Sequence, residues 1–377
     1  MRIYLDHNAT TPLHDEVVET MLRVLHDDYG NPSSVHAEGA RARELVERAR
    51  EQVASLLRAA PEEVVFTASA TEANNTRLRA LRPGQHVVTT EIEHPSVEAP
   101  LSGLESLGVD VTRVQADSEG CVAAAAVADA CRADTALIAV IWANNETGVI
   151  QPVEAIAVEA AARGIPLHVD ATQAVGKIPV DLSRIPASSL SLSAHKFGGP
   201  KGSGCLFMRD SAGIDALVSG GPQEAGRRGG TENVAGIAGL GVACELAERE
   251  LPRRMAGYAK LRDALWEGIR GSIPNVKSNG PQDRRLPNTL HVEFRQTAGE
   301  VLVQVLDLEG ISVSAGAACS SGSIEPSRVL VAMGRSPEEA RACLRFSVGH
   351  GVSAGQIEEV VAQLPDLVAR VRAAEGA

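Results

Sequence analysis

The segment Ser189–Met208 contains Lys196, and the other motifs of the sequence can be explained as parts of one site around this lysine. Lys196 stands between an apolar run and a glycine-rich turn, with His195 beside it and hydroxyls at Ser191 and Ser193. An amine kept partly out of water in this way is suited to form a Schiff base with an aldehyde. The alternative is a surface lysine at the junction of a strand and a turn. The remaining motifs must decide between these interpretations.

A first polar cluster follows the apolar run Val64–Phe66. Thr67–Asn75 consists of small and polar residues that lead into a predicted helix. The free N–H groups of a helix N-terminus, together with a nearby threonine hydroxyl, favour a phosphate. An ordinary helix cap at Ser69 or Thr71 is the alternative.

Two further polar clusters come directly after predicted strands. Asn144–Gly148 follows Ala136–Trp142, and Asp170–Gln173 follows Pro166–Val169. A carboxylate at a strand end can pair with a protonated ring nitrogen, and neighbouring amides can hold a phenolic oxygen. Turn residues and helix caps also use Asn, Asp, Thr and Gly, so each cluster alone stays open to that explanation.

A reactive lysine, a strand-end carboxylate and a phosphate site together predict pyridoxal 5′-phosphate as cofactor. The lysine would bind the aldehyde, the carboxylate would keep the pyridine nitrogen protonated, and the helix end would hold the phosphate. His94 follows the predicted strand His86–Thr89 and could cover the ring. A lone histidine is more often structural, but this one is predicted at the same edge of the sheet as the other clusters.

The elements that must position these residues alternate along the chain. Short apolar strands separated by helices indicate an α/β fold with a mostly parallel sheet covered on both faces. Ligands of such sheets bind beyond the carboxyl ends of the strands, where the polar clusters are found. The predicted strands are Val64–Phe66, His86–Thr89, Val111–Val114, Ala136–Trp142 and Pro166–Asp170. Helices are predicted over about Asp15–Leu25, before Leu57, and after Thr71, Pro95 and Pro152.

Length and composition set limits on the class of protein. A chain of 377 residues with 44% hydrophobic content is long enough for a large domain and a smaller one. A net charge of −12 argues against nucleic acid as a partner. No apolar signal core and no run long enough to cross a bilayer are found, so we expect a cytoplasmic protein. The six cysteines form no CxxC pair, which disfavours a disulfide framework and a structural zinc site.

Eight motifs resemble, in order, those of the NifS/IscS cysteine desulfurases, enzymes of the class V aminotransferase fold. The resemblance covers nearly the whole chain, and one departure is Ser69, where that family usually has glycine. The motifs are Tyr4–Pro12, Gly30–His36, Ala70–Glu72, Glu93–His94, Asn144–Gly148, His168–Gln173, His195–Gly202 and Arg345–Gly349.

The resemblance implies the fold type I of pyridoxal-phosphate transferases and a homodimer with its sites at the interface. Residues 15–250 would form a large cofactor-binding domain with a seven-stranded type of sheet. Residues 1–14 and 251–377 would form a small α+β domain that carries Cys319.

The resemblance also implies roles for single residues around the cofactor. Lys196 would carry it, Asp170 would pair with the ring nitrogen, and His94 would lie over the ring and shuttle protons. Gln173 and Asn145 would lie near the phenolic oxygen.

The same resemblance implies a phosphate site and a substrate site. The phosphate would be held by Ala70, Thr71, Ser193 and His195, and by Thr231 of the partner subunit. The substrate carboxylate would be bound by Arg345, with Asn31 nearby, because a planar guanidinium suits bidentate binding.

A second nucleophile separates a desulfurase from an aminotransferase. Cys319 lies in Ser312–Ser323, a run of small and polar residues that is typical of a mobile loop and matches the Ser-x-Gly-x-Ala-Cys pattern of the family. We predict that Cys319 receives sulfur as a persulfide, and it stays a candidate ligand for an iron–sulfur cluster, with no other metal ligand predicted. The other cysteines are expected to be buried core residues: Cys121, Cys131, Cys205, Cys244 and Cys343.

The expected reaction converts L-cysteine into L-alanine and a Cys319 persulfide. A sulfur-acceptor protein would then take the sulfur to iron–sulfur cluster assembly or tRNA thiolation. Three alternatives remain from the sequence. They are a selenocysteine lyase, another class V aminotransferase-fold enzyme that does not need Cys319, and a sulfur-carrying or scaffold partner that has lost its chemistry.

Overall fold

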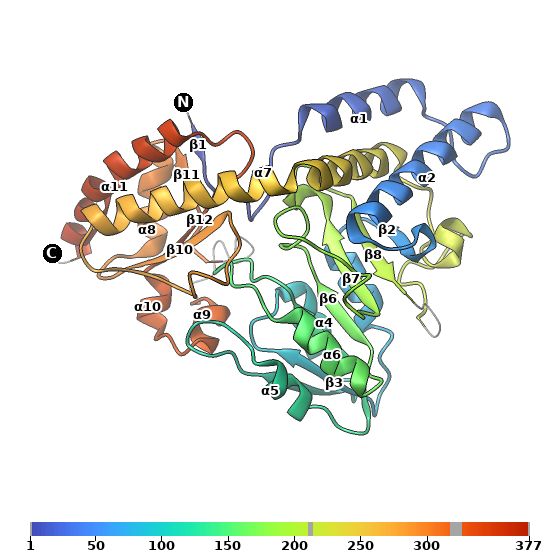
Figure 1. Ribbon diagram of the computed structural model, residues 1–377, viewed down its shortest axis with the longest axis horizontal. Coiled ribbons are helices and arrows are strands. Elements are labelled where there is room, and N and C mark those ends of the chain that lie inside the picture. The colour runs from blue at the N-terminus through green and yellow to red at the C-terminus, as the bar shows by residue number, and fades with distance from the viewer. Residues whose placement is uncertain (1, 210–213, 317–325, 376–377) are drawn as a thin grey trace.

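The computed structural model describes residues 2–209, 214–316 and 326–375 (Figure 1). Two groups of elements lie side by side, one built on a large sheet and the other on a small one. The predicted nucleophile Cys319 lies outside the described residues.

The large sheet has seven strands in the order β2-β8-β7-β6-β5-β3-β4. Five of its neighbouring strands, from β7 to β4, pair in parallel, whereas β8 runs antiparallel to both β7 and β2. This arrangement confirms the α/β prediction of a mostly parallel seven-stranded sheet. The strands are β2 (Val64–Thr67), β3 (His86–Thr90), β4 (Asp110–Val114), β5 (Thr135–Ile141), β6 (Leu167–Asp170), β7 (Ser189–Ser193) and β8 (Gly204–Met208).

Packed side chains cover both faces of this sheet. Successive residues of a strand point to opposite faces, and in β3 Val87 and Val88 belong to two different clusters of buried apolar residues. The predicted alternation of strands and helices therefore gives a central layer with helical layers on either side. The helices of this part are α1 (Asp15–Asp27), α2 (Ala37–Leu57), α3 (Ala70–Leu78), α4 (Pro95–Glu105), α5 (Ala124–Asp129) and α6 (Val153–Ala162), with short 3-10 turns η1 (Pro61–Glu63), η2 (Ala194–Lys196) and η3 (Gln223–Gly226).

The second group of elements is built on an antiparallel sheet in the order β12-β10-β9. The amino-terminal arm belongs to this group through a separate two-stranded sheet, in which β1 pairs in parallel with β11 from the carboxyl-terminal part. The strands are β1 (Ile3–Tyr4), β9 (Val276–Ser278), β10 (Thr289–Phe294), β11 (Ile311–Ser312) and β12 (Cys343–Ser347). The helices are α8 (Gly299–Leu308), α9 (Arg328–Ala332), α10 (Pro337–Arg341) and α11 (Ala354–Glu375).

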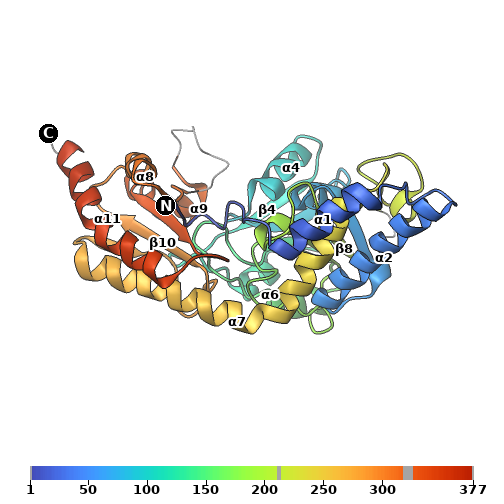
Figure 2. The same ribbon diagram turned by 90° about the horizontal axis from the view of Figure 1, so that it is seen from above.

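Helix α7 (Val234–Ser272) connects the two groups and runs from one half of the molecule to the other (Figures 1 and 2). Leu240 and Ala247 pack in the larger apolar core, and Leu265 and Ile269 pack in the smaller one. A domain boundary at residue 250 would therefore fall inside a continuous helix. The division into residues 15–250 and residues 1–14 with 251–377 stays a prediction.

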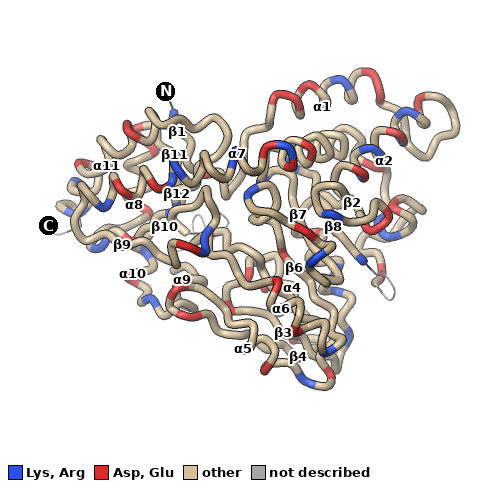
Figure 3. Tube along the Cα trace, in the orientation of Figure 1, with Lys and Arg blue, Asp and Glu red and all other residues tan. Residues whose placement is uncertain are grey.

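Charged residues of both signs are interspersed over the molecule (Figure 3). In α2, arginines and glutamates are interspersed along residues 41–50, and most of them are exposed, but Arg50 is buried and pairs with Glu224 at 2.8 Å. Among the described residues, no helix is both long and apolar enough to span a bilayer.

Gly204 of β8 lies very close to the backbone of β7 and to the backbone of the turn before α3. A Cβ atom at Gly204 of β8 would lie 2.8 Å from the Leu192 carbonyl oxygen and 2.8 Å from the Ser69 carbonyl carbon. Ser69 itself has an extended backbone, with φ −171°, which any residue adopts without strain. Ser69, which stands where the family usually has glycine, therefore causes no backbone strain in the turn before α3. The residue that makes the close backbone contact is Gly204.

We predict that Gly204→Ala lowers the free energy of unfolding by roughly 1–3 kcal/mol, because the added methyl group meets backbone atoms that cannot move aside. Urea denaturation would measure the change. Gly103→Ala is the matched control, since no atom lies within 4 Å of its added methyl group and it is inside α4. That variant should be stabilised by roughly 0.5–1 kcal/mol. Equal stability of Gly204→Ala and the unaltered protein would contradict the prediction.

Candidate active site

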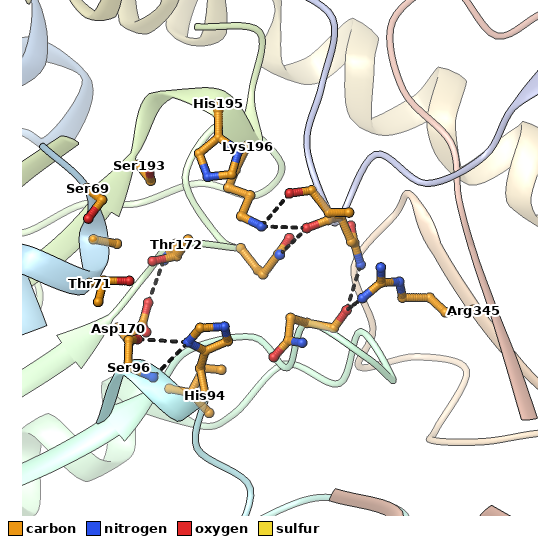
Figure 4. A pocket seen from close by; sticks show the side chains of 16 residues that line it. Ser69, Thr71, His94, Ser96, Asp170, Thr172, Ser193, His195, Lys196 and Arg345 are labelled. Atoms are coloured by element: carbon orange, nitrogen blue, oxygen red, sulfur yellow. Dashed lines mark hydrogen bonds between the residues drawn. The ribbon is translucent and has the colours of Figure 1, made fainter. Parts of the chain in front are cut away.

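A cavity of about 210 Å³ lies where β5, β6 and β7 end and α3 and α4 begin, and the amino-terminal arm closes one side of it. Figure 4 shows its side chains pointing toward one another from these elements. The cavity brings together ten of the residues that the sequence singled out, which are Ala70, Thr71, His94, Asn145, Asp170, Gln173, Ser193, His195, Lys196 and Arg345.

Among the predicted site residues that the structure describes, two do not line this cavity. Asn31 is exposed in the loop between α1 and α2, where its side chain accepts a hydrogen bond from the Ser33 N–H at 2.9 Å. Thr231 is exposed before α7, and the sequence assigned it to the site of a partner subunit. Both assignments stay predictions.

Lys196 lies in η2, directly after β7, and its side chain enters the cavity. Its Nζ donates hydrogen bonds to the carbonyl oxygens of Asn8 (2.7 Å) and Ala9 (2.8 Å) in the amino-terminal arm. These contacts place the amine beside the cavity, where the sequence required a reactive lysine.

A second lysine lies behind the first one. Lys177 is buried, and its amine donates to Asn8 Oδ1 at 3.2 Å and to Gln173 Oε1. Burial holds the pKa of Lys177 well below its usual range, and the positive charges of Lys196 and Arg345 lower that pKa further. Because the Lys177 amine donates to Oε1, the orientation of the Gln173 amide group is determined. Its Nε2 donates to the Asn8 carbonyl at 2.9 Å.

The part of the cavity for which the sequence predicted a phosphate site is built from hydroxyl groups and a helix N-terminus. Ser69 caps α3 by accepting the Glu72 N–H at 3.2 Å, and Thr71 lies in the first turn. His195 contacts Thr10 Oγ1 through Nδ1 at 3.1 Å. Burial, followed by the charges of Lys196 and other lysines, lowers the pKa of His195 to about 4, so the ring is neutral at pH 7.

Another part of the cavity wall carries a carboxylate and an imidazole. Asp170 Oδ1 accepts the Thr172 N–H at 3.0 Å, and Oδ2 accepts a hydrogen bond from Asn74 at 2.9 Å. His94 is the N-cap of α4, and its Nδ1 accepts the Ser96 N–H at 3.0 Å. Burial lowers the pKa of His94, which leaves a neutral ring against the cavity (Figure 4).

Glu93 lies behind His94 and is almost fully buried. Its Oε1 accepts the Thr90 hydroxyl at 2.6 Å and the Ile141 N–H at 2.9 Å. Burial raises the pKa of Glu93 to about 8 in spite of these two donors, and the Asp170 charge raises it further. At neutral pH Glu93 is therefore protonated, and Asp170 supplies the negative charge at this end of the cavity.

Arg345 reaches the cavity from β12, in the smaller sheet. Its side chain is 1% exposed, and it donates to Asp6 Oδ1 at 2.6 Å and to the Asn145 carbonyl at 2.8 Å. Its Nε is buried and has no hydrogen-bond partner within the described ranges. The guanidinium group is thus fixed at the cavity wall with donor capacity left over.

The cysteines outside Ser312–Ser323 were expected to be core residues. Cys121, Cys205, Cys244 and Cys343 are buried as predicted, whereas Cys131 is only partly buried and packs at the edge of the larger core. Burial raises the pKa of each of these thiols, so none of them is a ready nucleophile. In the described part of the chain no group of three or more His, Cys, Asp or Glu residues is placed to hold a metal ion.

Several residues in or next to the site were not singled out from the sequence, and four of them are Asn8, Lys177, Asn74 and Ser96. Asn8 lies inside the motif Tyr4–Pro12, which was noted only as a motif. Lys177 follows Gln173 by four positions, a spacing that could have indicated contact. Asn74 and Ser96 occur in helical segments, where the sequence gives no sign of what they face.

Comparisons with known proteins extend over both groups of elements. A model of the class V aminotransferase family matches residues 3–360. A cysteine desulfurase of Enterobacter agglomerans is 45% identical over 375 residues, which cover 98% of this chain and 93% of the relative. A solved NifS-like protein is 35% identical, with a TM-score of 0.92, over 98% of this chain and 100% of that one. A structure of SspA in complex with cysteine is 35% identical, with a TM-score of 0.82, over 92% and 99% of the two chains.

The buried Glu93 predicts a specific dependence of stability on pH. Between its ordinary pKa of 4.5 and about 8, the folded state keeps a proton that the unfolded state releases. The free energy of unfolding therefore falls as pH rises through this window, by about 1.4 kcal/mol per pH unit from this one group.

Glu93→Gln should lose this slope, so that its stability relative to the unaltered protein increases from pH 5 to pH 8. Urea denaturation at several pH values would measure the difference. Glu91→Gln removes a carboxyl group from the same segment and corrects for net charge. A constant difference between Glu93→Gln and the unaltered protein across this range would refute the assignment.

Proposed function

The chain belongs to the class V aminotransferase family, and from its likeness to cysteine desulfurases along nearly its whole length we propose that it removes sulfur from L-cysteine and releases L-alanine. The observation that carries this proposal is the cavity in which Lys196 and Asp170 face a common space. The relative solved in complex with cysteine supports the choice of substrate.

Pyridoxal 5′-phosphate is the cofactor of this family, and the donor set of the cavity fits it. An amine, a carboxylate and a group of hydroxyls beside a helix N-terminus line different sides of one space. The Thr172 hydroxyl is buried in the cavity wall without a hydrogen-bond partner in the described residues, which leaves a donor for a bound ligand. We assign Lys196 to the aldehyde, Asp170 to the ring nitrogen, and Thr71, Ser193 and His195 with the backbone at Ala70 to the phosphate.

The cofactor supplies an electron sink that weakens bonds at the substrate Cα atom. The residues around it handle protons and orientation. Lys196 would take the Cα proton, because its amine lies at the cavity and is held by backbone carbonyls that leave its position fixed. His94 would cover the ring and exchange protons with the substrate. Gln173 and Asn145 would hold the phenolic oxygen, and the first of these is oriented by Lys177.

Arg345 would bind the substrate carboxylate. It already pairs with Asp6, so a substrate carboxylate would share or replace that partner, and the unused Nε–H adds a further donor. A planar guanidinium can form two parallel hydrogen bonds to a carboxylate, which fixes the orientation of Cα toward Lys196. Asn31 remains a second candidate for this contact.

The sulfur transfer needs a thiol, for which we propose Cys319. Its thiolate would attack the substrate sulfur, the carbon–sulfur bond would break, and a sulfur–sulfur bond would form. The carbon fragment takes a proton and leaves as L-alanine. One thiol and one cysteine molecule thus give one persulfide and one alanine, with no external oxidant or reductant.

The assembly and the destination of the sulfur are also proposals. We propose a homodimer in which Thr231 of the partner subunit reaches the phosphate, since Thr231 is exposed in its own chain. A sulfur-acceptor protein in the cytoplasm would take the persulfide toward iron–sulfur cluster assembly or tRNA thiolation. Binding of an iron–sulfur cluster by Cys319 is a further candidate role of this residue.

The second candidate function, a selenocysteine lyase, would use the same cavity and is distinguished by comparing turnover of L-cysteine and L-selenocysteine. Another enzyme of the same fold would stay fully active without Cys319. A scaffold protein without chemistry is disfavoured by the cavity around Lys196.

We predict that the purified protein with pyridoxal 5′-phosphate, L-cysteine and a reductant produces sulfide and alanine in equal amounts. Lys196→Ala should lose activity by at least a thousandfold and no longer be labelled by borohydride, because it lacks the amine that binds the aldehyde. Cys319→Ser should bind the cofactor normally but release almost no sulfide, since it lacks the attacking thiol. Cys131→Ser is the matched thiol control and should remain active. Full activity of Cys319→Ser would reject the desulfurase proposal while leaving the cofactor assignment intact.

We further predict that Arg345→Lys raises the KM for L-cysteine about tenfold or more, because an ammonium group cannot form two parallel hydrogen bonds to a carboxylate. Steady-state kinetics would separate this effect from a change in kcat. Arg295→Lys, at an exposed position next to the same sheet, is the control and should keep the native KM. An unchanged KM in Arg345→Lys would remove this residue from the substrate site.

A further inference from the structure

A buried hydrogen-bond network connects the two polar groups at the ring end of the cavity. Asn74, in α3, is 0% exposed and donates through Nδ2 to Asp170 Oδ2 (2.9 Å) and to Ser96 Oγ (2.9 Å). Its Oδ1 lies 2.9 Å from His168 Nε2. Ser96 Oγ lies 2.8 Å from His94 Nδ1. A single amide therefore contacts the carboxylate, the residue that supports His94, and a second histidine.

The direction of each hydrogen bond in this network follows from Asp170, whose carboxylate can only accept. The Asp170 carboxylate only accepts hydrogen bonds, so the NH₂ group of Asn74 must face it. The other side of the amide, Oδ1, then faces His168 and requires a proton on its Nε2. Burial, together with the charge of Arg77, lowers the pKa of His168 to about 3, so this ring has a single N–H to give.

The same reasoning extends to His94. Ser96 Oγ accepts the second N–H of Asn74, so its own hydroxyl proton is directed to His94 Nδ1. The Ser96 backbone N–H points at the same nitrogen at 3.0 Å. With two donors at Nδ1, neutral His94 carries its proton on Nε2, on the side of the ring that is free to face the cavity (Figure 4).

We propose that Asn74 is a positioning residue that joins Asp170 and His94 into one hydrogen-bonded unit of fixed polarity, with His168 holding its amide. In this unit Asp170 is kept as an acceptor in one rotamer, and His94 presents an N–H donor to the substrate side of the cavity. The proposal rests on the proposed function for the meaning of the cavity, and it adds a residue that touches neither cofactor nor substrate.

The alternative role for Asn74 is purely structural, as a buried amide whose hydrogen-bonding groups are merely satisfied. Under that alternative, replacing Asn74 would lower stability without a directed effect on Asp170 or His94. A test must therefore read out the state of these two side chains as well as folding.

The first experiment uses the unaltered protein without added cofactor and records ¹⁵N spectra of its labelled histidines. His94→Gln and His168→Gln assign the signals by their disappearance. We expect both His94 and His168 to carry the proton on Nε2 at pH 7. A proton on Nδ1 in either ring overturns the proposal, and this result needs no variant of Asn74.

The second experiment measures binding of pyridoxal 5′-phosphate to the apoprotein of three variants. Asn74→Ala should bind about tenfold more weakly than the unaltered protein, because Asp170 loses a charge-assisted hydrogen bond. Asn74→Asp should bind more weakly still, since it places an acceptor where Asp170 needs a donor. Asn75→Ala is the matched control from the same helix, because the side-chain hydrogen bonds of Asn75 within the described chain go to the Thr71 carbonyl and to Arg79.

The third readout is the pH dependence of the visible absorbance of the loaded protein. Its midpoint should shift in Asn74→Ala and stay unchanged in Asn75→Ala. Equal dissociation constants and equal midpoints for these two variants would reject the role of Asn74, and melting temperatures report whether the variants fold. If the unaltered protein itself fails to bind the cofactor, the proposed function fails instead, while the ¹⁵N result still decides the tautomers.

Discussion

The position of Asn8 is the constraint on which the rest of the site depends. Its backbone carbonyl accepts hydrogen bonds from Lys196 and Gln173, and its Oδ1 accepts from Lys177 and Asn288. Its Nδ2 reaches the Asn145 carbonyl and a threonine hydroxyl in β10. One residue of the amino-terminal arm thus connects the Lys196 amine to both groups of elements. The arm can do so because β1 is anchored in the smaller group of elements.

Burial determines the protonation states of the histidines and of Glu93 around the cavity. The histidines next to the cavity, His94, His168 and His195, all have lowered pKa values, chiefly because burial disfavours their charged forms. The same cause raises the pKa of Glu93 to about 8. The apolar packing that makes the sheet stable therefore leaves these groups neutral. The Asp170 carboxylate and the Arg345–Asp6 ion pair then act in a medium with few competing charges, where electrostatic interactions are strong.

The large sheet could be predicted because its signals are local. Short apolar runs such as β5 are buried on both faces. Such a run predicts a parallel strand even when the strands that pair with it are not known. The antiparallel placement of β8 and the pairing of β1 with β11 depend on partners far away in the sequence, so no local pattern indicated them. The same distinction holds in the site. Residues at strand ends were found, whereas the contacts of Asn74 are made with two other elements, β6 and α4, that only the folded chain brings next to α3.

Helix α7 has a consequence for how the molecule can move. Because its two ends are buried in different apolar cores, the halves cannot rotate relative to each other unless the helix bends or leaves one core. Pro252 lies in the helix between these two ends, and a bend of α7 is expected at this residue. Because one helix contributes to both cores, loss of α7 from either core removes apolar contacts from both halves at once.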